Sequence, residues 1–156
     1  MHPRILRTID ANVNRISEGL RVLEDISRYI IEDVNTSRQL KSIRHQVNQL
    51  VSGIATHLIQ TRDVEGDIGS GFDLIDEHQD LAAVVRANAK RAQEGIRVLE
   101  ELSKLPDLKS VISSTKLKES RYHIYSIEKS IITKLPDQRI SNKDGKKVER
   151  KGKSLP

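Results

Sequence analysis

Apolar residues recur at spacings of three and four along most of this 156-residue chain. The runs with this spacing lie at residues 9–30, 40–58, 85–99 and 112–131. The spacing is typical of amphipathic helices, and no segment alternates with the period of two that a half-buried strand shows. Pro106 and Pro136 end the two periodic runs of the second half, because proline cannot continue a helix. The pattern predicts an all-α protein.

The first helical segment is written twice. Residues 11–28 and 87–104 are identical at 10 of 18 positions with an offset of 76 residues, far more than chance allows. A second similarity follows each copy, between LKSIRHQV from Leu40 and LKESRYHI from Leu117, where the offset is 77. The sequence therefore predicts two tandem helical hairpins that form a four-helix bundle with pseudo-twofold symmetry.

The domain boundaries follow from this duplication. We expect a helical domain at residues 1–135, with repeat one at about 5–60 and repeat two at about 80–135. The glycine-rich loop 61–79 joins the repeats, and a basic tail at 136–156, expected to be disordered, follows them.

Charge and composition exclude several functional classes. From Lys134 onward the chain carries eight basic and three acidic residues, whereas the remainder carries 19 of each and is neutral. A neutral body argues against a nucleic-acid partner, so an RNA-binding function would rest on the tail alone. The lack of cysteine excludes disulfides and thiolate metal sites. No apolar run is long enough to span a membrane, and we expect a cytoplasmic protein.

Polar residues and glycines interrupt the apolar arc of the duplicated helix. Asn12 and Gly19 fall within the arc, and Arg15 lies at its edge. The second copy holds the equivalent residues Asn88, Gly95 and Arg91. In a structural interpretation, the two asparagines bond to each other across the pseudo-dyad and the glycines allow close helix approach. In a functional interpretation, the halves enclose a polar cleft whose guanidinium groups grip an anion.

Other charged residues of the duplicated helix point to ordinary helix chemistry. Arg21 with Asp25, and Arg97 with Glu101, have the spacing of i,i+4 surface pairs. The glutamates at positions 24 and 100 are predicted to lie outside the apolar arc.

The loop TRDVEGDIGSGFD, residues 61–73, has no counterpart after the fourth helical run. It offers Arg62, the carboxylates of Asp63 and Asp67, and several glycines, among them Gly69. Glycine-rich backbone can cradle a phosphate, and carboxylates beside such a site suit Mg²⁺. The alternative is a flexible loop between helices that is rich in turn residues.

The segments ILRTIDANVNRISEGLRVLEDISRYIIED, LKSIRHQV, TRDVEGDIGSGF and VVRANAKRAQEGIRVLEELSKL resemble a known family over about residues 3–130. It is the all-helical domain that is often fused ahead of thiamine-phosphate synthase and is assigned as a hydroxymethylpyrimidine-phosphate kinase. The resemblance implies transfer of the ATP γ-phosphoryl group to hydroxymethylpyrimidine phosphate, which gives the diphosphate used in thiamine biosynthesis. The alternative is a non-catalytic module that binds the pyrimidine phosphate or delivers it to a separate synthase. A separate thiamine-phosphate synthase and a second copy of this chain are the candidate protein partners.

The matched positions suggest roles for individual residues. The residues expected to grip phosphates are Arg15, Arg62 and Arg91. The residues expected to hold Mg²⁺, beside ATP as co-substrate, are Asp63 and Asp67. The residues expected to orient or contact the substrate are Asn12, Gly19, Asn88, Gly95 and Gly69.

Overall fold

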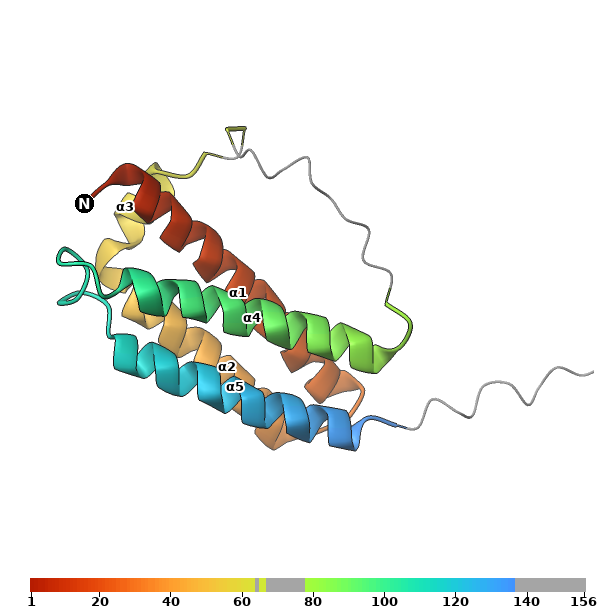
Figure 1. Cartoon of the computed structure of the whole chain (residues 1–156). Coiled ribbons are helices and arrows are strands. Elements are labelled where there is room, and N and C mark those ends of the chain that lie inside the picture. The colour runs from red at the N-terminus through yellow and green to blue at the C-terminus, as the bar shows by residue number, and fades with distance from the viewer. Residues whose placement is uncertain (64, 67–77, 137–156) are drawn as a thin grey trace, which may run out of the picture.

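The computed structural model describes residues 1–63, 65–66 and 78–136. Its elements are α1 (Pro3–Tyr29), α2 (Val34–Leu50), the 3₁₀ helix η1 (Ser52–Ile54), α3 (Ala55–Gln60), α4 (Leu81–Leu102) and α5 (Ser114–Lys134), as Figure 1 shows. The described residues contain no strand, which confirms the predicted all-α class. The disorder predicted for the tail concerns residues that, apart from Pro136, lie outside the described ranges.

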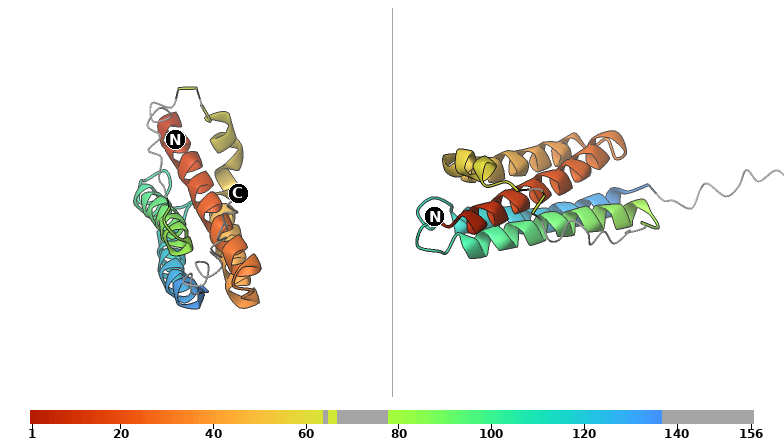
Figure 2. Two further views of the ribbon diagram at one scale, coloured as in Figure 1. Left: turned by 90° about the vertical axis from the view of Figure 1, so that its right-hand side faces the viewer. Right: turned by 90° about the horizontal axis from the view of Figure 1, so that it is seen from above.

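The four long helices form a bundle in which each repeat supplies one hairpin. α1 packs against α2 in the first repeat, and α4 packs against α5 in the second. The largest contact between the repeats joins α1 to α4, and a smaller one joins α2 to α5 (Figures 1 and 2). None of the described helices combines the length and the apolarity that crossing a bilayer would require.

The contact between α1 and α4 is reciprocal about the pseudo-dyad. A Cβ atom placed on Gly19 would lie 2.7 Å from the backbone oxygen of Asn88. A Cβ atom on Gly95 would lie 2.7 Å from Cγ1 of Ile16 and 3.3 Å from the backbone oxygen of Asn12. Gly19 therefore lies opposite Asn88, and Gly95 lies opposite Asn12. Since the later residue of one helix meets the earlier residue of the other, the two helices run antiparallel. Both glycines allow the helix backbones to approach more closely than any other residue would.

The centre of this contact is filled with apolar side chains rather than hollow. The fully buried residues of α1 and α4 near the two glycines include Ile16, Ala89, Ala92 and Ile96. The expectation of a polar cleft between the halves therefore does not hold at the crossing of α1 and α4, because small and branched apolar residues close it.

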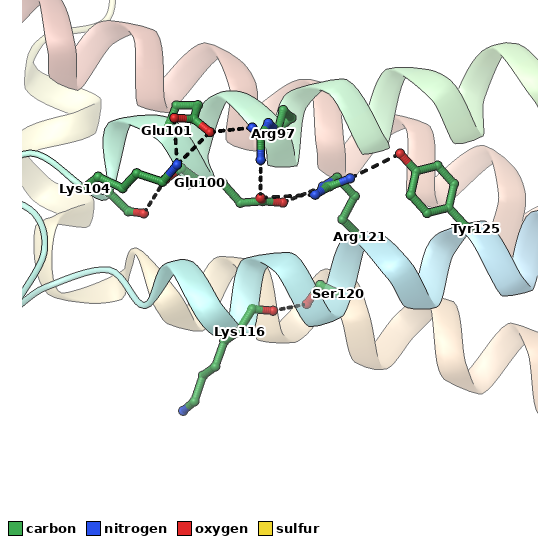
Figure 3. Close-up of polar contacts among 9 residues, drawn as sticks. Arg97, Glu100, Glu101, Lys104, Lys116, Ser120, Arg121 and Tyr125 are labelled. Atoms are coloured by element: carbon green, nitrogen blue, oxygen red, sulfur yellow. Dashed lines mark hydrogen bonds and ion pairs between the residues drawn. The ribbon is translucent and has the colours of Figure 1, made fainter.

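A buried ion pair joins the two helices of each repeat. In the first repeat Arg44 Nη2 donates to Glu24 Oε2 over 2.7 Å, and in the second Arg121 Nε donates to Glu100 Oε1 over 2.5 Å. Figure 3 shows the second pair, with Arg97 approaching the same carboxylate from α4. The two glutamates are only 5% and 3% exposed, so the prediction that they lie outside the buried arc was wrong. The arginine of the neighbouring helix covers each carboxylate and supplies the charge that allows its burial.

The second helical run of the first repeat is interrupted, whereas the prediction continued it through residue 58. α2 ends at Leu50, and the chain passes through the 3₁₀ turn before it resumes as α3. The Oγ atom of Ser52 donates to the backbone oxygen of Gln49 over 2.8 Å and closes the helix end. α5 continues without a break over the equivalent stretch. Because of the interruption α3 contacts α1, which brings the residues after α3 to the first turns of α1.

Candidate functional site

Two ion pairs connect the end of α3 to the beginning of α1. Arg62 binds the carboxylate of Asp10 in bidentate fashion: its Nε and Nη2 atoms each donate over 2.8 Å to one carboxylate oxygen. Arg7 Nη1 donates to Asp63 Oδ2 over 3.2 Å, and Arg7 Nη2 donates to the backbone oxygen of Asp63 over 2.8 Å. We call these four residues the α1–α3 cluster. Its two halves are more than fifty residues apart in the sequence and meet only because α3 folds back onto α1.

Local hydrogen bonds fix the chain at this point. The Oγ1 atom of Thr61 donates to the backbone oxygens of His57 and Leu58 over 3.1 Å and closes the end of α3. One turn later the backbone N–H of Gly66 donates to Asp63 Oδ1 over 2.9 Å. A Cβ atom at Gly66 would collide with the carboxylate of Asp63, so a larger residue there would displace that side chain. These contacts hold Arg62 and Asp63 toward α1.

The two carboxylates of the cluster differ in their surroundings. The side chain of Asp10 is 10% exposed, whereas the side chain of Asp63 is 53% exposed. The hydrogen bonds that Arg62 donates to Asp10 raise the pKa of the guanidinium further above its already high usual value. Asp10 is thus a fixed anchor for the guanidinium, and Asp63 is a carboxylate that water and ligands can reach.

Arg62 combines a fixed position with open donors. Its side chain is 46% exposed although one edge is bound to Asp10. A guanidinium has five N–H donors, and the two used here leave three for an incoming group. A planar, oriented guanidinium of this kind is suited to a phosphate or carboxylate. Two arginines and two aspartates sum to zero charge, however, so an anion would have to replace a carboxylate or arrive with a cation.

The predicted substrate-binding residues of the duplicated helix lie elsewhere, at the contact between α1 and α4. Asn12 is 6% exposed and Asn88 is 7% exposed. Each donates its amide N–H to the backbone oxygen four residues earlier, Asn12 to Thr8 and Asn88 to Val84. The predicted bond between the two asparagines is therefore wrong, because each amide is bonded to its own helix. Beside them lie Gly19 and Gly95, whose packing is described above.

The remaining predicted residues are not gathered with the α1–α3 cluster by any contact in the described ranges. Arg15 and Arg91 are exposed at equivalent positions of α1 and α4. Asp67 and Gly69 lie outside the described residues, so the predicted pair of Mg²⁺ ligands is represented here by Asp63 alone. Within the part of the chain that the structure describes, no group of three or more His, Asp or Glu side chains could hold a metal ion.

The predicted i,i+4 surface pairs are confirmed. Arg21 Nε lies 3.3 Å from Asp25 Oδ2, and Arg97 Nη2 lies 2.7 Å from Glu101 Oε1. Arg97 also donates to the buried carboxylate of Glu100, which gives it a second, structural role.

Sequence reasoning missed Arg7 and Asp10. Neither has a counterpart of the same charge type in the second copy, where the residue equivalent to Asp10 is Arg86. That difference was the available signal, because a residue that changes its charge between two copies is free of the symmetric packing role. The partner of Asp10 could not be predicted in this way, since the hydrophobic periodicity does not place Arg62 beside α1.

The chain matches the family model described as the ThiD2 family over residues 7–130. A thiamine-phosphate synthase of Rhodopirellula baltica is 39% identical over 106 residues, which are 66% of this chain and 28% of that protein. A protein of the same name from Synechococcus sp. (strain WH7803) is 37% identical over 132 residues, 83% of this chain and 36% of its own length. A third, from Thermosynechococcus vestitus, is 33% identical over 147 residues, 93% of this chain and 40% of its own length.

The chain therefore spans about a third of the length of the curated relatives it matches. No solved structure matches it. Because this family model covers most of the sequence, including the duplicated helices and all four residues of the α1–α3 cluster, the chain belongs to the ThiD2 family.

Proposed function

We propose that this chain is a kinase of thiamine biosynthesis that transfers the γ-phosphoryl group of ATP to hydroxymethylpyrimidine phosphate. The observation that carries the proposal is the guanidinium of Arg62, fixed by the buried Asp10 and open on its other side. The relatives named thiamine-phosphate synthase support the pathway, because the product diphosphate is the form that thiamine synthesis uses.

The chemistry fits a site without a histidine base. An oxygen of the acceptor phosphate attacks the γ-phosphorus, and the bond from that phosphorus to the bridging oxygen of ADP breaks. The acceptor is a phosphate monoester whose second pKa is about 6, so it is already largely a dianion at neutral pH and no proton needs to be removed. The demand is instead the neutralisation of two polyanions that approach each other. Arginines in fixed positions meet that demand.

In this proposal the α1–α3 cluster rearranges around its exposed carboxylate. Asp10 keeps Arg62 oriented, because it is buried and bound at both oxygens. Asp63 is half exposed, and an incoming phosphate would replace it as the partner of Arg7. Arg15 and Arg91 remain proposed phosphate ligands at the exposed positions described above.

Once a phosphate has replaced Asp63 as the partner of Arg7, the carboxylate of Asp63 is suited to bind Mg²⁺. Mg²⁺ is usually held by one or two carboxylates together with substrate phosphates and water, so a site with few protein ligands is sufficient. The proposed second carboxylate is Asp67. When bound, the ion would supply charge neutralisation on the phosphates of ATP.

A second function, a carrier that binds the pyrimidine phosphate and hands it to a synthase, is favoured by one observation. Both carboxylate oxygens of Asp63 already accept hydrogen bonds, Oδ2 from Arg7 and Oδ1 from the backbone N–H of Gly66, so Asp63 orients an arginine that could bind a phosphate. A carrier needs the arginines alone and has no use for Mg²⁺.

The experiment follows ADP and the diphosphate product after the full chain is incubated with Mg²⁺-ATP and hydroxymethylpyrimidine phosphate. We expect both products, with a rate that falls about a hundredfold in Arg62→Lys, since lysine cannot keep the bidentate bond to Asp10. Arg38→Lys is the matched control, because Arg38 is exposed and has no ion pair among the described residues. Binding of the pyrimidine phosphate without ADP formation would support the carrier. The absence of both binding and ADP formation would contradict both functions, and an Arg62→Lys rate equal to that of the wild type would contradict the role given to Arg62.

A further inference from the structure

Two of the three tyrosines of the chain lie together on the outer face of α5. Tyr122 is 56% exposed and Tyr125 is 44% exposed, and their ring centroids are 5.9 Å apart in an edge-to-face arrangement. The guanidinium carbon of Arg121 lies 5.2 Å from the centre of the first ring and 5.9 Å from the centre of the second. In a chain with only 3% aromatic residues, this is a concentrated and accessible aromatic surface.

Tyr125 borders a groove of about 560 Å³ between α4 and α5. Figure 3 shows its ring in the space between the two helices, beside the ion pair of Arg121 and Glu100. At the floor, the amide of Gln93 is nearly buried and donates to Glu128 Oε2 over 2.7 Å. The volume is within the range of small-molecule sites.

Two cations on the α4 side of this groove are held only loosely. Arg86 Nη2 lies 3.8 Å from Asp80 Oδ1, and Lys90 Nζ lies 3.7 Å from Glu94 Oε1. Their side chains are 56% and 73% exposed. Ion pairs of this length at the surface are weak, so both cations can turn to an anionic ligand.

The first repeat shows that a buried ion pair between the two helices forms without neighbouring tyrosines. At the positions equivalent to Tyr122 and Tyr125 it has His45 and Asn48. The buried ion pair between the two helices forms there all the same, with Arg44 and Glu24. In the second repeat the hydroxyl of Tyr125 accepts a hydrogen bond from Arg121 Nη1 over 3.3 Å, but the first repeat shows that such an ion pair does not require it. The exposed face of the ring is therefore available to a ligand.

The cations follow the same asymmetry. The residues of the first repeat equivalent to Arg86 and Lys90 are Asp10 and Asn14, so neither position carries a positive charge there. The ring of Tyr125 and these two cations thus line one groove of one repeat, together with the carboxylates of Glu94 and Glu128. Because these residues differ from their equivalents in the first repeat and lie at the same groove, we infer that they share a ligand.

We propose that the groove between α4 and α5 binds a nucleoside phosphate. The base would stack on the exposed ring of Tyr125, as bases commonly do on aromatic side chains, and Arg86 and Lys90 would receive the phosphates. A single nucleotide suits the site better than a nucleic acid chain, because the charges of the helical body are balanced and offer no track for a phosphate backbone. The site is built from α4 and α5 and shares no residue with the α1–α3 cluster, so it stands independently of the proposed phosphoryl transfer.

The test is calorimetric titration of the full chain with ADP, without any pyrimidine phosphate. We expect saturable binding. The affinity should weaken about tenfold in Tyr125→Leu, which removes the ring that stacks on the base, and about fivefold in Arg86→Gln, which removes a cation that receives the phosphates. Adenosine and inorganic triphosphate should each bind at least about tenfold more weakly than ADP, since each lacks one half of the ligand. Tyr29→Leu is the matched control, because Tyr29 is 64% exposed and also stacks against an arginine, but lies at the end of α1.

Three results would overturn the inference. The first is the absence of ADP binding by the wild-type chain, and the second is an unchanged affinity in both Tyr125→Leu and Arg86→Gln. The third is binding that is lost in Arg62→Lys but kept in Tyr125→Leu, which would put the nucleotide at the α1–α3 cluster. A chain that binds ADP through Tyr125 and transfers no phosphoryl group would refute the proposed kinase and leave this inference intact.

Discussion

Replacing Gly19 with alanine should force α1 and α4 apart. The added Cβ atom would lie 2.7 Å from the backbone oxygen of Asn88, whereas ordinary van der Waals contact begins at 3.4 Å. The two helix backbones must therefore separate by about 0.7 Å at this point, and a gap of that size forfeits a quarter to a half of the dispersion energy of the neighbouring contacts. A carbonyl oxygen within a helix cannot move aside independently, so the strain is shared by the whole contact.

The magnitude follows from two opposing effects. Overpacking of a core costs about 1–3 kcal/mol, and replacing glycine by alanine within a helix returns about 1 kcal/mol. We therefore expect Gly19→Ala to lower the free energy of unfolding by up to about 2 kcal/mol. Gly95→Ala should cost somewhat less, because its nearest atom belongs to the side chain of Ile16, which can change its rotamer at a smaller cost.

The assay is urea unfolding followed by circular dichroism at 222 nm, with Gly53→Ala as the matched control. A Cβ atom at Gly53 meets nothing within 4 Å, so that variant should equal or exceed the wild type in stability, by up to about 1 kcal/mol. If Gly19→Ala were as stable as Gly53→Ala, the close approach of the helices would not depend on the missing Cβ. The glycine would then need another explanation, such as the substrate contact predicted from the sequence.

The buried carboxylate of Glu100 should be indispensable to the fold: Glu100→Gln leaves a guanidinium without its counter-ion and should lower the free energy of unfolding by about 2–4 kcal/mol in the same assay. The hydroxyl of Ser103 donates to a backbone oxygen over 2.8 Å, whereas the buried hydroxyl of Ser27 has no partner among the described residues. Ser103→Ala should therefore cost about 1 kcal/mol, and Ser27→Ala should cost nothing or stabilise. A hydrogen bond from Lys134 lowers the pKa of Asp33, so this pair contributes stability above the ordinary aspartate pKa and loses it as the pH falls below about 4. Lys134→Gln should flatten the fall of the urea midpoint between pH 5 and pH 3.

The duplicated helix shows which structural features the sequence predicts and which it does not. Periodicity found the four long helices, because burial of one face leaves a spacing that can be read directly. Glu24 shows the limit: it follows Leu6 by eighteen residues, five full turns, and so shares the buried side of α1 with that leucine. The prediction placed it outside the apolar arc, but the arginine that neutralises it comes from another helix, and the helical wheel of α1 alone cannot show that partner.

The candidate site was predicted only in part, for a related reason. The loop between the repeats, which has no counterpart after the fourth helical run, drew attention to Arg62 and Asp63 as candidate site residues. Their partners on α1 depend on the break at residues 51–54, which turns α3 back toward the start of the chain. The side-chain contact that marks this turn is the hydrogen bond from Ser52 to the backbone oxygen of Gln49, a weak feature within an otherwise helical pattern. The contacts that follow from it are long-range and leave no periodic trace.

The most direct test of the proposed function follows ³²P from the γ-position of ATP into hydroxymethylpyrimidine phosphate. The wild-type chain should form labelled diphosphate, and Asp10→Asn should lower the rate about a hundredfold, because Asp10 fixes the orientation of Arg62. Asp107→Asn is the control, since that carboxylate is 69% exposed and contacts only the N-terminal amine in the described residues. Labelled diphosphate from the wild type and the control, but hardly any from Asp10→Asn, is the predicted result. Equal labelling by all three proteins, or none by the wild type, would contradict the account.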